Sequence, residues 1–148
     1  MVVWLADFIT KRAAEHYLWT APAPVRVLGD FLRFNLGHNP HGAMGMSLGS
    51  ASRIVFSVLS VLMLGLLWSY YRQAAPTDRL RAAALGAISG GALGNLFDRW
   101  RSPLGVADFI DIGVGQWRFW TFNLADTALT CGGIVLAFVL FKERSPAK

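Results

Sequence analysis

Charged residues and cysteine are both scarce in this sequence. Asp, Glu, Lys and Arg make up 16% of its 148 residues, whereas an average soluble protein contains about 25%. The single cysteine, Cys131, lies inside an apolar run, so no intrachain disulfide can form. No Cys/His cluster has the spacing of a metal site, and the sequence contains no HExxH motif. The sequence therefore predicts no metal and no other cofactor.

The hydrophobic residues, which make up 54% of the chain, are concentrated in long runs. Residues 54–71 form a run of 18 without a charge, and residues 124–141 form another 18 with Asp126 as the only charge. A helix rises about 1.5 Å per residue, so each run nearly crosses the ~30 Å hydrocarbon core of a bilayer. Both runs are predicted to be transmembrane helices.

A third run, residues 82–97, is uncharged over 16 residues and rich in glycine. Gly86, Gly90 and Gly94 recur every four residues and therefore form one stripe of small residues on a helix. Such a stripe lets a neighbouring helix approach closely in lipid, where no hydrophobic effect drives helices together. We expect a third membrane helix here, with the stripe packed against the fourth.

The amino terminus has an apolar lead of only six residues before Asp7, and Lys11 and Arg12 follow. That lead is too short for an ordinary membrane span, and it lacks the cleavage pattern of a secretory signal peptide. We expect a first membrane helix that is truncated in this sequence, with a short, tilted helix as the alternative. The chain would then have four transmembrane helices.

The basic residues predict the orientation of these helices. Three arginines fall in the ten residues 72–81 and three basic residues in the seven residues 142–148. Residues 20–53 and 98–121 are longer and carry only three basic residues each. The positive-inside rule places the first two segments and both termini in the cytoplasm. The basic residues that give the net charge of +5 are concentrated at the ends of the predicted spans. No nucleic-acid partner is therefore predicted.

The outward segments are more than plain linkers. Residues 22–46 contain short alternating stretches separated by Gly, Asn and Pro, which favours a small β element lying on the membrane. No repeat or domain linker is present, so residues 1–148 are predicted to form a single domain. The expected fold is all-α and integral to the membrane, with four transmembrane helices and a small extracytoplasmic β structure.

Five polar residues are expected at one depth, the outer membrane surface. Asn95 and Asp98 are three residues apart near one helix end, Asn123 and Asp126 are three apart near another, and Asp108 lies in the intervening loop. Two carboxylates a few ångströms apart share a proton. One then takes a proton from water while the other donates one, which is peptide hydrolysis without a metal or a covalent intermediate.

Other interpretations of these residues stay open on physical grounds. Asp126 and Asp98 could be the intramembrane acids of a proton-coupled transporter, and the glycine stripe could be the dimer face of a non-catalytic scaffold. Asp98 could also form a structural ion pair with Arg99, and Asp111 is expected to be a solvated loop residue.

Three sequence blocks resemble, in order, the signature blocks of the lipoprotein signal peptidases, also called signal peptidase II: GGALGNLFDR (90–99), VADFI (106–110) and FNLAD (122–126). DFITK (7–11) resembles the block near the end of that family's first helix, and HNPHGAMG (38–45) resembles its asparagine-glycine block. The similarity spans nearly the whole chain. Two features depart from the pattern: the apolar lead is shorter, and two residues instead of one separate Asn39 from Gly42.

The resembled family consists of four-helix aspartic peptidases of the bacterial inner membrane. They remove the signal peptide from prolipoproteins, cutting just before a cysteine that carries diacylglycerol. The resemblance implies that Asp108 and Asp126 are the catalytic pair. It implies supporting roles for Asn39, Asn95, Asp98, Arg99 and Asn123 around the pair and the substrate, and structural roles for Asp7 and Lys11. The partners would be diacylglyceryl-prolipoproteins and membrane lipids, and we expect a monomer with its site at the outer face.

Overall fold

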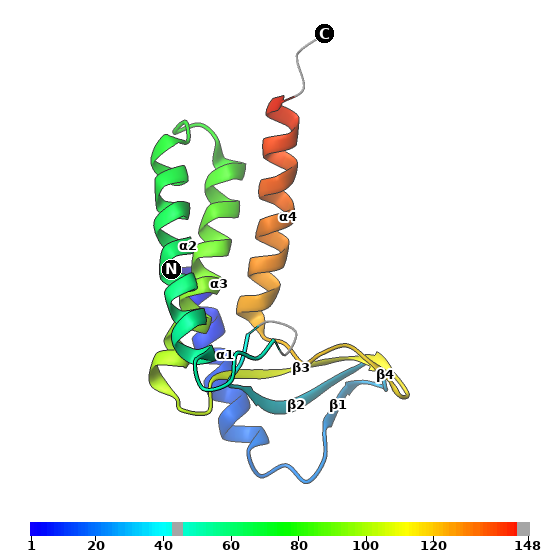
Figure 1. Cartoon of the computed structure of the whole chain (residues 1–148). Coiled ribbons are helices and arrows are strands. Elements are labelled where there is room, and N and C mark those ends of the chain that lie inside the picture. The colour runs from blue at the N-terminus through cyan, green and yellow to red at the C-terminus, as the bar shows by residue number, and fades with distance from the viewer. Residues whose placement is uncertain (43–45, 145–148) are drawn as a thin grey trace.

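A computed structural model describes residues 1–42 and 46–144 of the chain. Helices α2 (Ser52–Gln73), α3 (Arg79–Arg101) and α4 (Leu124–Arg144) stand side by side, with α3 in the middle (Figure 1). The shorter helix α1 (Val2–Leu18) packs against α3 and α4 at the end where α2 and α4 begin, which we call the sheet end. The helices therefore occupy the four segments that the sequence predicts.

Two of the helices within the described residues are long and apolar enough to cross a membrane, at Gly49–Gln73 and Leu124–Glu143. Helix α3 has 23 residues, which is about 35 Å of helix, and ten of these residues are buried. A central helix that faces its neighbours on several sides can carry glycine, Asn95 and Asp98 where a lipid-facing helix carries leucine. Its lower hydropathy therefore follows from its position.

A four-stranded antiparallel sheet extends sideways from the sheet end of the bundle (Figure 1). Its strands lie in the order of the sequence: β1 (Val25–Leu28), β2 (Leu32–Asn39), β3 (Val106–Val114) and β4 (Trp117–Arg118). The β element predicted in residues 22–46 is confirmed by β1 and β2, while its residues 43–45 lie outside the described residues. Gly29 and Gly115 supply the positive φ angles, 54° and 57°, of the two hairpin turns.

The expectation of a loop around Asp108 and Asp111 is wrong, because both lie on β3. The two carboxylates interrupt the alternation of apolar and polar residues by which a half-buried strand is recognised. Both are only 7% exposed, so the strand carries acidic residues at buried positions. A pattern built on hydrophobic burial cannot detect such a strand.

The glycine stripe packs mainly against a different helix from the one predicted, although Gly94 meets both Asp7 of α1 and Ala125 of α4. A Cβ atom on Gly90 would lie 2.7 Å from Cβ of Val3 in α1, whereas Gly86 faces open space. Helix α4 approaches α3 at Gly91 instead, where a Cβ atom would lie 2.5 Å from the carbonyl oxygen of Ala125. Gly91 lies about 100° around the helix from Gly90, so two adjacent glycines admit two different neighbours.

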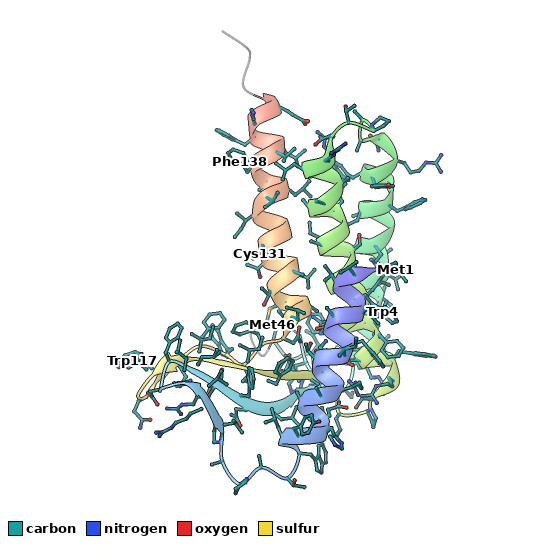
Figure 2. All side chains as sticks on the ribbon, turned by 180° about the vertical axis from the view of Figure 1, so that it is seen from behind. Met1, Trp4, Met46, Trp117, Cys131 and Phe138 are labelled. Atoms are coloured by element: carbon teal, nitrogen blue, oxygen red, sulfur yellow. The ribbon has the colours of Figure 1, made fainter. Side chains whose placement is uncertain are left out.

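The outer surface of the bundle is apolar. Leu67, Leu85 and Ile88 form a small buried cluster between the helices, but most large apolar side chains of α2 are exposed, as are Ile134, Phe138 and Phe141 of α4. Leu62, Ile134 and Phe138 are each at least 60% exposed, and Figure 2 shows Phe138 projecting away from the other helices. A soluble monomer rarely exposes a continuous apolar surface of this extent. The bundle therefore has the surface of a protein embedded in lipid.

The close approach at Gly91 leads to a stability prediction. We expect Gly91→Ala to lower the free energy of unfolding by about 1–3 kcal/mol, because the added methyl overpacks the α3–α4 contact. Gly86→Ala is the matched control and should be neutral or stabilising by up to about 1 kcal/mol, since its methyl meets open space and alanine favours helix. Thermal unfolding in detergent measures both, and equal stabilities would contradict the assigned contact.

Candidate active site

Asp126 lies in the first turn of α4 and is held there by helix capping. The main-chain NH of Asp126 donates to Oδ1 of Asn123 (2.9 Å), and the main-chain NH of Asn123 donates to Oδ2 of Asp126 (3.2 Å). This reciprocal pair is the capping box of a helix start, built here from Asn and Asp. The same bonds that begin α4 therefore fix the Asp126 side chain.

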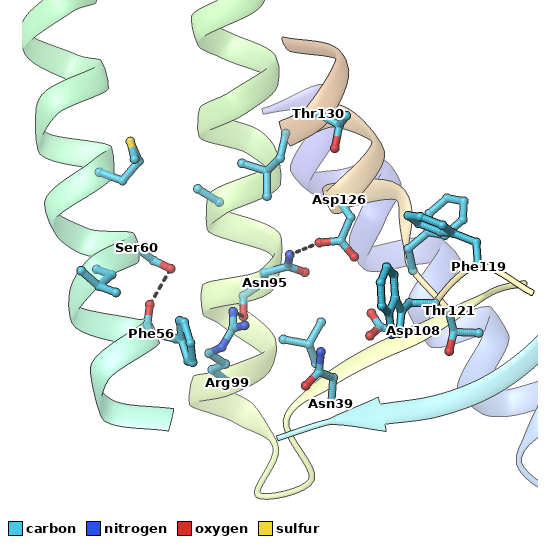
Figure 3. A pocket seen from close by; sticks show the side chains of 17 residues that line it. Asn39, Phe56, Ser60, Asn95, Arg99, Asp108, Phe119, Thr121, Asp126 and Thr130 are labelled. Atoms are coloured by element: carbon cyan, nitrogen blue, oxygen red, sulfur yellow. Dashed lines mark hydrogen bonds between the residues drawn. The ribbon is translucent and has the colours of Figure 1, made fainter. Parts of the chain in front are cut away.

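Asp108 approaches the same place from the sheet. Its Oδ1 accepts a hydrogen bond of 2.6 Å from the side-chain amide of Asn123, which is fully buried. Asn123 therefore contacts both carboxylates, one through its side chain and one through its main chain. Figure 3 shows Asp108 and Asp126 lining one pocket, from β3 and α4 respectively. The predicted pair is brought together from segments that the sequence places apart.

Asn95 of α3 is the third residue of this group. Its amide nitrogen donates to Oδ1 of Asp126 (2.7 Å; Figure 3). Its amide oxygen accepts from Asn123 (3.2 Å) and from the ammonium group of Lys11 (2.9 Å). These bonds run between helices, and they connect Asp126 to helix α1.

Lys11 is buried, with 1% of its surface exposed, and its ammonium group lies 2.8 Å from Asp7 and 3.0 Å from Asp98. Oδ1 of Asp7 accepts from the NH of Ala125 (2.8 Å), and Oδ2 of Asp98 accepts from the NH of Ala107 (3.3 Å). Those two amides directly precede Asp126 and Asp108. The Lys11 cluster, which we define as Lys11, Asp7 and Asp98, therefore holds the main chain next to both carboxylates.

Two expectations about ion pairs are wrong. Asp98 pairs with Lys11 and with Arg12 (3.0 Å), while the Arg99 guanidinium donates to the carbonyl oxygens of Asn95 (3.2 Å) and His41 (3.3 Å). Successive residues on a helix point about 100° apart, which directs Asp98 toward α1 and Arg99 toward α2. The sequence does not predict the pairing of Arg12, one residue after Lys11, because its charge resembles that of the basic residues that ordinarily flank a membrane span.

Asp111 is the second ion-pair correction. It was expected in solvent, but it is buried and accepts a hydrogen bond of 2.8 Å from Nε of Arg118. The partner lies on β4, seven residues away, and is brought close only by the β3–β4 hairpin. Recognising the pair would have required recognising the hairpin.

Asn39 reaches the site in spite of the extra residue in its motif. Its side-chain amide donates to the carbonyl oxygen of Gly42 (3.1 Å), and its Oδ1 accepts from the NH of His41 (2.9 Å). This local turn absorbs the inserted residue. Asn39 lies beside Asp108 at the edge of the pocket (Figure 3).

Two cavities meet at the carboxylates. One, of about 420 Å³, lies between α2, α3, α4 and the sheet and is largely apolar, with Phe56, Leu59 and Met63 of α2 in its wall. The other, of about 440 Å³, lies over the sheet and is more polar, with His38, Asp111 and Arg118 in its lining. The cavities share five residues: Asn39, Asp108, Phe119, Trp120 and Thr121. The aromatic pair Phe119 and Trp120 was not singled out from the sequence.

The environment of Asp108 changes its acidity. Burial, reinforced by the negative charge of Asp126, raises the pKa of Asp108 from 3.8 to about 7. The hydrogen bond from Asn123 and the positive charge of Lys11 act in the opposite direction and do not cancel this rise. Asp108 therefore keeps its proton at pH values where an ordinary aspartate has lost it. A protonated carboxyl beside a second carboxylate is the arrangement required for general acid–base hydrolysis.

The fold and the site together define the class as a helical membrane protein with two carboxylates in the lining of one pocket. A family model described as "Signal peptidase (SPase) II" matches residues 1–142. The chain belongs to the signal peptidase II family and is an aspartic peptidase of that type.

Similar proteins extend along most of the chain. Proteins named lipoprotein signal peptidase are 36% identical in Streptomyces griseus, over 99% of this chain and 72% of theirs, and 36% identical in Coxiella burnetii, over 94% and 84%. Two solved structures described as bacterial membrane enzymes also match. They have TM-scores of 0.86 and 0.82 with 27% and 28% identity, covering 99% and 95% of this chain and 87% and 88% of theirs.

The Lys11 cluster can be tested through stability. Lys11→Met leaves the buried Asp7 without its cation and Asp98 with Arg12 alone, so we expect a loss of about 3–5 kcal/mol in the free energy of unfolding. Lys142→Met, on the exposed last turn of α4, is the matched control and should change stability by less than about 1 kcal/mol. Thermal unfolding of the purified variants measures the difference. If Lys11→Met unfolds like the control, the cluster does not hold the site.

Proposed function

We propose that this protein removes the signal peptide from diacylglyceryl-modified prolipoproteins, cutting just before the lipidated cysteine with Asp108 and Asp126 as catalytic residues. The observation that carries the proposal is the convergence of two carboxylates on one pocket, joined through the buried Asn123. Family membership and the names of the relatives support the substrate class.

The chemistry follows from the different surroundings of the two acids. Asp108 holds a proton and donates it to the carbonyl oxygen of the scissile bond. Asp126 takes a proton from a water molecule whose oxygen attacks the carbonyl carbon, which gives a tetrahedral diol. Asp126 then gives its proton to the amide nitrogen while Asp108 takes a proton back from one hydroxyl of the diol, so the C–N bond breaks, a carboxylic acid and an amine leave, and both acids return to their starting states. Atoms and charges balance with water as the only co-reactant.

The different polarities of the two cavities indicate in which direction the substrate chain would run through the site. The largely apolar cavity between α2, α3 and α4 suits the hydrophobic residues that precede the cut. The polar cavity over the sheet suits the main chain that follows the cysteine. Because Asp108 lines both cavities, a peptide that runs from one to the other passes the carboxylates. Asn39, Asn95 and Arg99, which line the apolar cavity, are proposed to position the substrate main chain, with Asn123 holding the two carboxylates.

The proposed setting is the bacterial inner membrane. The α2–α3 connection and the last turn of α4 lie together at the end farthest from the sheet, where Arg81 pairs with Glu143 (Figure 1). Both segments are rich in basic residues, which favours the cytoplasm for that end and the outer face for the active site. We propose four membrane helices, of which α1 begins partway along the bundle (Figure 2), a cytoplasmic carboxyl terminus and one peptidase domain over residues 1–148. The site takes all its residues from one chain, so a monomer suffices.

Loss of either carboxylate tests the proposal directly. We expect Asp108→Asn and Asp126→Asn each to reduce cleavage of a diacylglyceryl-modified prolipoprotein at least about 10³-fold, because each acid has its own proton to move. Glu143→Gln, at the opposite end of the bundle, is the carboxyl control and should cleave normally. The mobility shift of the precursor on a gel is the measurement. Cleavage by a well-folded Asp108→Asn or Asp126→Asn protein at the control rate would overturn the dyad.

The raised pKa of Asp108 predicts a pH profile. Above pH 7 Asp108 loses its proton, so the pair can no longer donate one, and kcat/KM should fall about tenfold per pH unit. The apparent pKa of this alkaline limb belongs to the pair and is expected near 7. Initial rates between pH 5 and pH 9 in a constant ionic strength buffer measure it. A rate that is flat to pH 9, with binding not limiting, would contradict the acid role of Asp108.

A further inference from the structure

The far end of the sheet exposes four large apolar side chains. Leu28 and Phe31 flank the β1–β2 turn and are 63% and 52% exposed, while Val114 and Trp117 flank the β3–β4 turn and are 63% and 89% exposed. We call these four residues the sheet tip. None of them lines either of the two cavities at the carboxylates, so the active site does not account for them.

The two turns form one surface. The NH of Gly113 donates to the carbonyl oxygen of Phe31 (3.0 Å), and the NH of Gly115 donates to Oδ2 of Asp30 (2.6 Å). The Arg118 guanidinium donates to the carbonyl oxygen of Asp30 (2.7 Å), which ties the second hairpin to the first turn again. The four apolar side chains are therefore presented together.

The charges of these two turns are neutralised internally. Residues 28–33 and 113–118 contain three charged side chains. Asp30 pairs with Arg33, and Arg118 pairs with Asp111 at 2.8 Å. The tip therefore has no unpaired charge that would attract a charged partner. Its exposed side chains are apolar, and they include the aromatic rings of Phe31 and Trp117. An exposed Trp beside aliphatic side chains is typical of the interface between water and lipid.

The depth of the tip follows from the helices. The sheet leaves the bundle sideways, in both Figure 1 and Figure 2, and Trp117 lies at its far end, away from the helices (Figure 2). The membrane-spanning segment of α4 begins at Leu124, and the connection from β4 stays on the sheet through the bond from Phe119 NH to the carbonyl oxygen of Ile112 (2.8 Å). The sheet therefore runs near the plane where the spans enter the membrane.

We propose that the sheet tip is a membrane anchor that inserts among the phospholipid headgroups of the leaflet where α2 and α4 begin. The anchor gives the sheet a second point of attachment, far from the helices. Since β3 carries Asp108, tip insertion fixes the tilt of the strand that bears this carboxylate. The occupant of the surface is the bilayer itself, and the inference stands whether or not the pair is catalytic.

Spin labels of known depth test the anchor. The native cysteine is first removed by Cys131→Ser, and a nitroxide is then attached to Val114→Cys or, separately, Trp117→Cys in vesicles of phosphatidylethanolamine and phosphatidylglycerol. Ala23→Cys, in the exposed connection between α1 and β1, is the aqueous control, and Phe138→Cys on the outer face of α4 is the lipid control. Collision rates with oxygen and with a water-soluble nickel chelate report the depth of each label.

We expect both tip labels to collide with the nickel chelate at least about threefold less often than the Ala23→Cys label, and with oxygen more often. Val114→Cys keeps Trp117 intact, so its result does not depend on losing the tryptophan. Equal nickel accessibility at the tip and at the aqueous control, in protein whose thermal unfolding is unchanged, would overturn the proposal.

Discussion

One buried ammonium group holds this structure together at its functional end. Lys11 faces Asp7 and Asp98 in a place where all three side chains are almost fully enclosed. Charges of this kind tolerate burial only as a set, because removing one leaves the others without compensation. Asp7 uses its other carboxylate oxygen to accept from the NH of Ala125, and the Asp98 oxygen that faces Lys11 also accepts from the NH of Ala107. Helix α1 lines neither cavity at the carboxylates, but its residues Asp7 and Lys11 hold the start of α4 and the start of β3 in place relative to each other.

The residues that cap helix α4 also hold the two carboxylates. Asn123 closes the first turn of α4 with its side-chain oxygen and uses its side-chain nitrogen on Asp108. Asp126 completes the capping box by accepting the main-chain NH of Asn123 with one carboxylate oxygen. Its other carboxylate oxygen accepts from the side-chain amide of Asn95. Each carboxylate is thus positioned by bonds that the fold requires in any case. Because the same bonds cap the helix and position the carboxylates, a short membrane chain can orient two acids without a separate supporting domain.

The sequence predicts the helices well because their signal is local. Long apolar runs mark α2 and α4, and the polar residues of α3 and α4 recur at helical spacing, so their depth could be inferred. Strand β3 could not be predicted, because Asp108 and Asp111 are buried at positions where the pattern of a strand requires apolar residues. The ion pairs of Asp98 and Asp111 were missed for a related reason. Their partners, Lys11, Arg12 and Arg118, come close only through helix packing or through the unrecognised hairpin.

The burial that raises the pKa of Asp108 also weakens the fold. An aspartate has a pKa of about 3.9 in an unfolded chain, whereas that of Asp108 is about 7 in the folded protein. Between these values the unfolded state releases a proton that the folded state keeps, so stability falls as pH rises through this window and stays lower above it. About three pKa units correspond to roughly 4 kcal/mol. This cost must be offset by strong bonds nearby, and the Lys11 cluster supplies them on the side of the two carboxylates that faces away from the pocket.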